Sequence, residues 1–166
     1  MLVILAILAG IGVDCARGAD PVAEPAPVGT EVLRPSVGIV PPNGYSEAMA
    51  MPDCAPWDGP AVLLYLLDST SDAVPPVNRH VRVEIWKGQA ELAHHTFRWP
   101  ANPAPGAAAQ CSSDGSCEAA IEGRVAFGAV DPDRSVAGEL DLRFASGNSV
   151  RQAFKARWQP RRIACG

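Results

Sequence analysis

The clearest pattern in the chain is an alternation of apolar and polar positions near the C-terminus. Between residues 135 and 144 the apolar positions share one face and the charged positions the other, the apolar ones being Val136, Leu140, Leu142 and Phe144. The alternation resumes after a turn at 145–148, with Val150, Phe154, Ala156 and Trp158 on the apolar face. A period of two residues is typical of a strand with one buried face. We therefore predict an antiparallel hairpin, in which the acidic outer face of the first strand meets the basic outer face of the second.

Earlier segments show the same kind of signal. Residues 61–67 form a continuous apolar run, which is typical of a central strand buried on both faces. Residues 81–86 alternate, so that Trp86 is expected on the outer face while Val81, Val83 and Ile85 face inward. After a turn at 87–90, residues 91–99 are expected to return as the hairpin partner of that strand. Residues 117–130 resume the alternation, and Gly123 indicates a bulge within them.

These patterns predict an all-β fold. Six strands joined by short turns, with no long amphipathic helix, favour a small antiparallel β-sandwich. A small up-and-down barrel is the alternative.

The first part of the chain has a different composition. Residues 1–18 resemble a signal peptide, because an apolar core ends at Val13 and small residues follow, although no basic residue precedes that core. Attachment of a lipid to Cys15 is a weaker alternative, since Asp14 precedes it where a small residue is usual. Residues 19–44 are rich in proline and alanine and are expected to be a stiff linker. The folded domain is then expected at 45–166, outside the cytoplasm and either periplasmic or secreted, with no stable membrane span in the mature chain.

Composition narrows the function classes. The net charge of −4 and the apolar content of 48% suit a globular domain, and a nucleic-acid partner is not expected because such proteins usually carry a basic surplus.

Four cysteines follow the leader, and their spacing is not that of a zinc site. Sequence alone leaves three pairings open. Cys111 and Cys117 flank a Ser-Asp-Gly turn, and Cys54 and Cys165 bracket the whole domain, so disulfides between the members of each pair are the favoured arrangement.

No motif in the chain predicts a catalytic residue, a metal or a cofactor. His80 facing His94 or His95 across the expected hairpin would make a two-histidine site, and Glu139 with Asp141 would be the acids of a hydrolase. We interpret these residues instead as ordinary positions on strands. Four tryptophans would offer a sugar-binding platform if two were exposed side by side, and Trp86 is the best candidate for contact with a partner.

The sequence therefore favours a non-enzymatic exported domain that binds an unknown protein or an envelope component. A small barrel that carries an apolar ligand is the second hypothesis, and a secreted hydrolase is the third.

Overall fold

A computed structural model describes residues 44–70, 73–131 and 133–166, which belong to a compact unit spanning Val37–Gly166. The expected leader at 1–18, with Cys15, and residues 19–43 of the expected linker lie outside the described residues. Within the described ranges, no helix has the length and apolar character needed to cross a membrane.

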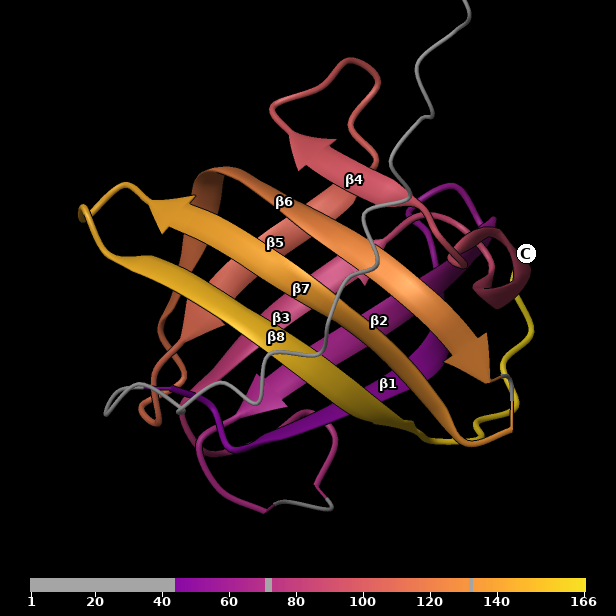
Figure 1. The fold of residues 1–166 in the computed structure, drawn as a ribbon, viewed down its shortest axis with the longest axis horizontal. Coiled ribbons are helices and arrows are strands. Elements are labelled where there is room, and N and C mark those ends of the chain that lie inside the picture. Colours follow the sequence, from indigo (N-terminus) through magenta and orange to yellow (C-terminus); the bar gives the residue numbers. More distant parts are fainter. Residues whose placement is uncertain (1–43, 71–72, 132) are drawn as a thin grey trace, which may run out of the picture. The chain divides into compact units, whose positions relative to one another are not determined.

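The regular secondary structure of the described residues is almost entirely strand (Figure 1). One short 3-10 helix, η1, occupies Gln89–Glu91. The eight strands are β1 (Glu47–Cys54), β2 (Pro60–Leu67), β3 (His80–Ile85), β4 (Thr96–Trp99), β5 (Gly106–Cys111), β6 (Cys117–Asp131), β7 (Ser135–Phe144) and β8 (Ser149–Trp158). The all-β prediction is confirmed.

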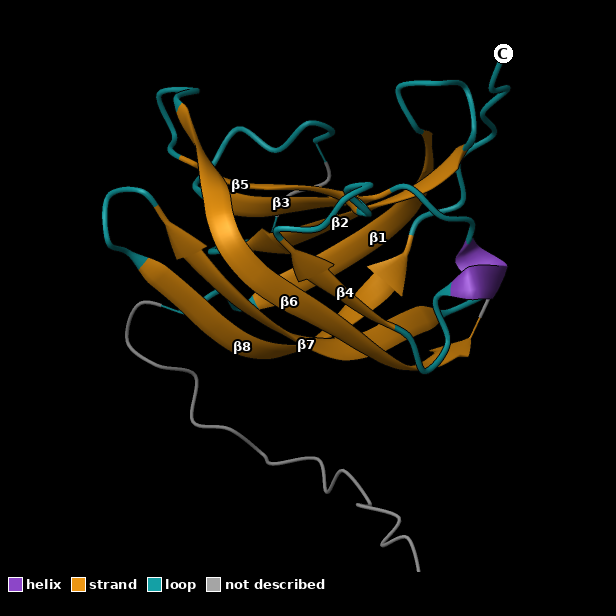
Figure 2. Ribbon diagram, turned by 90° about the horizontal axis from the view of Figure 1, so that it is seen from above, coloured by secondary structure: helices purple, strands orange, loops and turns teal. Residues whose placement is uncertain are grey.

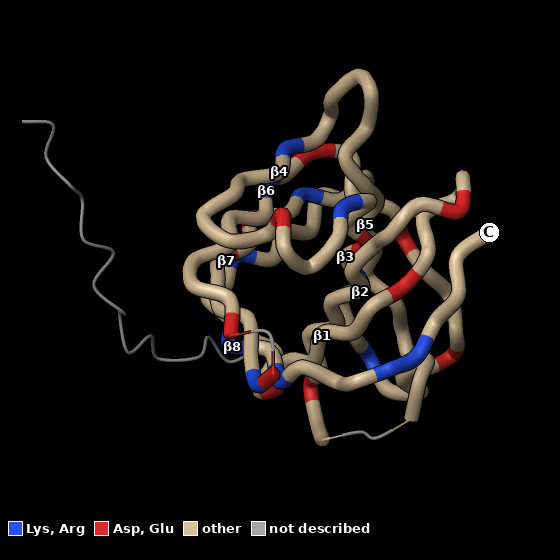
Figure 3. Tube along the Cα trace, turned by 90° about the vertical axis from the view of Figure 1, so that its right-hand side faces the viewer, with Lys and Arg blue, Asp and Glu red and all other residues tan. Residues whose placement is uncertain are grey.

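The sheet closes on itself, so the predicted sandwich is wrong and the barrel alternative is nearer to the structure. Seven strands form the ring in the order β6-β5-β3-β2-β1-β8-β7, and β7 pairs again with β6 (Figures 2 and 3). The barrel is mixed and not purely antiparallel, because β1 and β8 pair in parallel through Met49 with Arg157 and Ala50 with Trp158.

β6 accounts for much of the closure. It pairs with three strands, and its register with β7 shifts twice, which are the irregularities that bend a strand.

The expected hairpin between residues 81–86 and 91–99 does not form. β3 pairs with β2 and β5, whereas β4 pairs with β6, from Thr96 opposite Ala126 to Trp99 opposite Gly123. The helix η1 and the fully buried Leu92 lie between β3 and β4. Both edges of β3 are occupied, by β2 and β5, so β4 pairs instead with β6, on the edge that β5 occupies further back along that strand.

The interior of the barrel is filled by side chains from every strand of the ring. In β7 the residues Val136, Leu140, Leu142 and Phe144 are all buried, as the alternation predicts. Three phenylalanines pack edge to face across the interior, with ring centroids 5.9 Å apart for both Phe97–Phe127 and Phe127–Phe154. A ring of this strand number has an interior about wide enough for its own side chains.

β2 is buried on both faces, which confirms the reading of its continuous apolar run. Its inner face contributes Val62, Leu64 and Leu66 to the interior. Its outer face contributes Leu63, Tyr65 and Leu67 to a second apolar cluster, together with Met49 and Met51 of β1. Sequence analysis predicted no strand in residues 45–60, and the structure shows that half of them form β1.

Two disulfides tie this fold together. Cys54–Cys165 joins the end of β1 to the C-terminal segment, and Cys111–Cys117 joins β5 to β6 across their turn. The Gln159 amide also donates to the Ala50 carbonyl at 2.7 Å, so the C-terminal segment starts out along β1. Disulfides persist in oxidising compartments, so this pair of bonds indicates an extracytoplasmic environment.

Candidate functional site

Trp86 directly follows β3, on the outer side of the sheet. Its side chain is half-buried and lies next to a second tryptophan. The ring centroids of Trp57 and Trp86 are 4.9 Å apart and their planes meet at 75°. The Trp86 indole N–H donates to Glu84 at 3.0 Å, and Glu84 also pairs with Arg82 at 2.9 Å. We call Trp57 and Trp86 the tryptophan corner. Its outer member, Trp57, is 62% exposed and is the only aromatic among the exposed large apolar residues of the described chain.

The turn that presents Trp57 is tightly held. The Ala55 amide donates to the Gly59 carbonyl at 2.8 Å, and the Asp58 amide donates to the Ala55 carbonyl at 2.9 Å. Asp58 has a φ of 63°, in the left-handed region, and a Cβ at Gly59 would lie 2.9 Å from the Trp57 indole nitrogen. Gly59 therefore leaves the space that the Trp57 ring occupies. The turn directly follows Cys54, whose disulfide with Cys165 anchors its first end.

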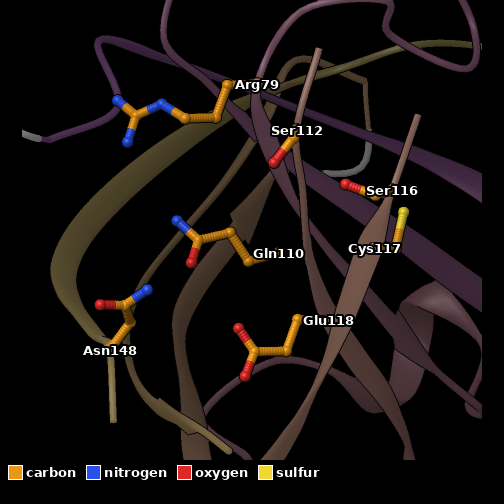
Figure 4. Close-up of a pocket in the computed structure, with 7 residues that line it drawn as sticks. All are labelled: Arg79, Gln110, Ser112, Ser116, Cys117, Glu118 and Asn148. Carbon is orange, nitrogen blue, oxygen red and sulfur yellow. The ribbon is translucent and has the colours of Figure 1, made fainter. Parts of the chain in front are cut away.

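A second candidate is a polar pocket of about 450 Å³ at one mouth of the barrel. Figure 4 shows its longer side chains around one opening: Arg79 from just before β3, Gln110 from β5, Glu118 from β6 and Asn148 from the β7–β8 turn. Several of these groups already have protein partners. Arg79 pairs with Asp68 at 3.6 Å, and both Glu118 oxygens accept hydrogen bonds from Ser146.

Tyr45 closes the barrel beneath this pocket. Its amide donates to the Gln152 side chain at 2.9 Å, its carbonyl accepts from the same side chain, and its hydroxyl accepts from Gln110 at 2.9 Å. The Arg79 guanidinium lies 5.1 Å from its ring centroid. Burial raises the pKa of the Tyr45 phenol above its usual 10.0, against the opposing effects of the Gln110 hydrogen bond and the Arg79 charge. These contacts make the mouth a structural closure of the barrel.

A third candidate lies on the outer surface, where a pocket of about 450 Å³ crosses β4, β6 and β7. Its walls combine Trp99 and Pro100 with charged side chains, three of them arginines: Arg98, Arg124 and Arg143. Sequence analysis did not single out this pocket, because its arginines are far apart in the chain and meet only through the pairing of β4 with β6.

The histidines do not come together. His80 is buried at the start of β3 opposite Cys111, and its ring packs against Tyr65 with centroids 5.4 Å apart. His94 and His95 instead hydrogen-bond to β6 through their backbones, at Gly128 and Phe127, near the opposite end of the barrel. The described residues contain no group of three or more histidines, cysteines or acids placed to hold a metal ion.

The two acids considered for a hydrolase are paired with arginines on the surface of the sheet. Glu139 lies 2.7 Å from Arg124, and Asp141 lies 3.8 Å from Arg151. The second contact is the cross-strand pair of opposite charge expected between β7 and β8, whereas the first reaches β6 instead.

Sequence analysis did not single out Trp57, which entered it only as one of the four tryptophans of the chain. The signal that identifies it is the run Pro56-Trp57-Asp58-Gly59-Pro60, in which proline, aspartate and glycine are turn residues around a single large aromatic. Trp158, by contrast, packs against the interior as predicted, and Trp99 does so as well.

Comparison of the chain with family models, with curated proteins and with solved structures gives no match.

Proposed function

We propose that this protein is a non-enzymatic, exported binding module, and that the tryptophan corner is its contact surface. The observation that carries the proposal is the exposure of Trp57 on a hydrogen-bonded turn. Tryptophan has only two side-chain torsions to order on binding, and it is among the residues that dominate binding energy at interfaces.

The neighbourhood of the corner supports the same reading. Trp86 gives a second ring at a steep angle to the first, so the pair presents a corner into which a flat or compact group fits. Lys87 and Glu91, which pair at 3.1 Å, supply charged groups in the segment that follows Trp86. A ligand would thus meet an apolar centre with polar groups beside it, the arrangement usual in interfaces.

Two other functions are less well supported. A closed barrel is the architecture of many carriers of apolar ligands, but here phenylalanine and leucine side chains occupy the interior. A ligand there would have to displace the core. A hydrolase requires an acid and a base that converge on one substrate, whereas Glu139 and Asp141 are held by arginines.

The experiment is co-sedimentation of the purified domain with insoluble envelope fragments of the host cell, wild type against Trp57→Ala. Val77→Ala is the matched control, because Val77 is 68% exposed in the loop between β2 and β3, away from the corner. We expect Trp57→Ala to lower the bound fraction about tenfold, as loss of a binding hot spot does, while Val77→Ala binds like the wild type. No sedimentation of the wild type, or equal loss in both variants, would contradict the proposal.

Gly59→Ala adds a sharper test. The added methyl group would meet the Trp57 indole and displace it without removing it. Binding that depends on the position of the ring should fall in Gly59→Ala. Binding that depends on apolar surface alone should stay.

A further inference from the structure

The outer surface of β4, β6, β7 and β8 carries a charged belt, which consists of Arg98, Glu122, Arg124, Glu139, Asp141, Arg143 and Arg151. Strand register places these residues on adjacent positions. Arg98 is opposite Arg124, Arg124 is opposite Asp141, and Asp141 is opposite Arg151. Glu122 is likewise opposite Arg143.

The ion pairs of the belt involve all of its arginines except Arg98. Arg124 pairs with Glu139, Arg143 with Glu122, and Arg151 with Asp141. Each of the three carboxylates is thus taken by one guanidinium. Within the described part of the chain, no carboxylate lies within ion-pair distance of Arg98.

The position of Arg98 is unfavourable for an arginine without a partner. Residues directly opposite in an antiparallel ladder have Cβ atoms about 4.5–5.5 Å apart, and like charges there destabilise the sheet. Arg98 and Arg124 are such a pair, in a chain whose net charge is −4. An anion bound between the two guanidinium groups would remove the repulsion and supply the missing charge.

The pocket of about 450 Å³ is located at this pair. Its lining includes three arginines, two acids and a few neutral residues: Arg98, Arg124, Arg143, Glu122, Asp141, Ser149, Trp99 and Pro100. Both acids are already paired with arginines, Glu122 with Arg143 and Asp141 with Arg151, so Arg98 brings the unbalanced charge. Guanidinium groups bind oxyanions through paired N–H donors. Two guanidinium groups on neighbouring positions of one face present several N–H donors from two directions, and the three or four oxygens of a tetrahedral oxyanion can accept from both at once.

We propose that this pocket binds a tetrahedral oxyanion group, phosphoryl or sulfuryl, carried on a small organic molecule. Arg98 and Arg124 hold the anion from its two sides. Pro100, which is exposed close to Arg98, contacts the organic part, which fills the room that the anion leaves. The site is separate from the tryptophan corner and does not depend on it.

The test is calorimetric titration of the full domain with inorganic phosphate, inorganic sulfate and glycerol 1-phosphate, at constant ionic strength set with chloride. Arg98→Gln removes the arginine without a carboxylate partner. Lys155→Gln is the matched control, since Lys155 is an exposed cation of β8 opposite Ala137 and outside the pocket. Circular dichroism and the melting temperature verify that each variant is folded.

We expect saturable binding to the wild type and to Lys155→Gln, with affinity at least about tenfold weaker in Arg98→Gln, as loss of a charge-assisted contact predicts. Arg98→Lys should recover only part of the affinity, because an ammonium lacks the planar fork. Tighter binding of glycerol 1-phosphate than of phosphate supports the substituted ligand. Tighter binding of the free anions overturns the organic part of the proposal. Absence of saturable binding, or equal weakening by Arg98→Gln and Lys155→Gln, overturns the site itself.

Discussion

Single residues divide into those that fill the barrel and those that the fold holds outside it. Leu142 and Phe144 of β7 have no exposed surface, whereas Trp57 keeps 62% of its surface in solvent. The sequence distinguishes the first group well, since alternation alone assigns the inner face of β7. It does not identify the second, because exposure of Trp57 depends on a turn geometry and on the space left by Gly59.

Leu142→Ala should destabilise the domain by about 2–5 kcal/mol, because it leaves a cavity in a packed interior. Chemical denaturation with urea measures the change. Ile121→Ala is the control, since Ile121 is 48% exposed at the bulge of β6 and should cost less than about 0.5 kcal/mol. Equal losses in the two variants would mean that the inner face of β7 is wrongly assigned.

The two buried tyrosines should make stability depend on alkaline pH. Burial raises the pKa of Tyr45 and that of Tyr65 above the usual 10.0. A phenol with a higher pKa in the folded state keeps its proton longer there than in the unfolded chain. Its contribution is complete below the unfolded pKa, and it is lost as pH rises from that value through the folded pKa. Stability should therefore decline above about pH 10.

Urea midpoints measured from about pH 8 to about pH 11 test this decline. Tyr45→Phe removes one titrating phenol and should make the slope shallower than that of the wild type. At neutral pH the same variant loses the hydrogen bond to Gln110, at a cost of about 0.5–1.5 kcal/mol. An unchanged slope in both Tyr45→Phe and Tyr65→Phe would contradict the assigned burial.

At the scale of elements, local patterns predict strands better than they predict partners. β7 and β8 form the expected hairpin, because a short turn joins them and both alternate strongly. β4 was expected beside β3, but it pairs with β6, about 27 residues further along the chain. No local sequence pattern predicts a pairing over that separation. β1 escaped prediction because Pro52 interrupts it, and proline is uncommon inside strands. The pairing of β1 with β8 joins strands from the two ends of the domain. Local patterns predict hairpins between successive strands and cannot predict such a distant pairing.

The two disulfides should differ in their effect on stability. Cys54–Cys165 closes a loop with a sequence separation of 111, and Cys111–Cys117 closes one of 6. By chain entropy, the first should contribute about 4.8 kcal/mol and the second about 2.4 kcal/mol. We expect the Cys54→Ser/Cys165→Ser variant to melt well below the Cys111→Ser/Cys117→Ser variant. The reverse order would show that the C-terminal segment adds little to the fold.

As a whole, the molecule combines a filled, closed barrel with functional candidates on its outside. The interior is packed with apolar side chains, Tyr45 closes one mouth, and the tryptophan corner and the charged belt lie on outer surfaces. The disulfides fit a domain that works outside the cytoplasm. This distribution favours the proposed recognition through exposed side chains over binding of a ligand inside the barrel.

Hydrogen–deuterium exchange of the domain, free and bound to envelope fragments, tests that claim most directly. We expect new protection at residues 55–59 and 86–91, around the tryptophan corner, while the amides of the inner strands exchange as they do in the free domain. Protection confined to the strands that surround the interior would contradict the account, because it would show that the ligand enters the barrel.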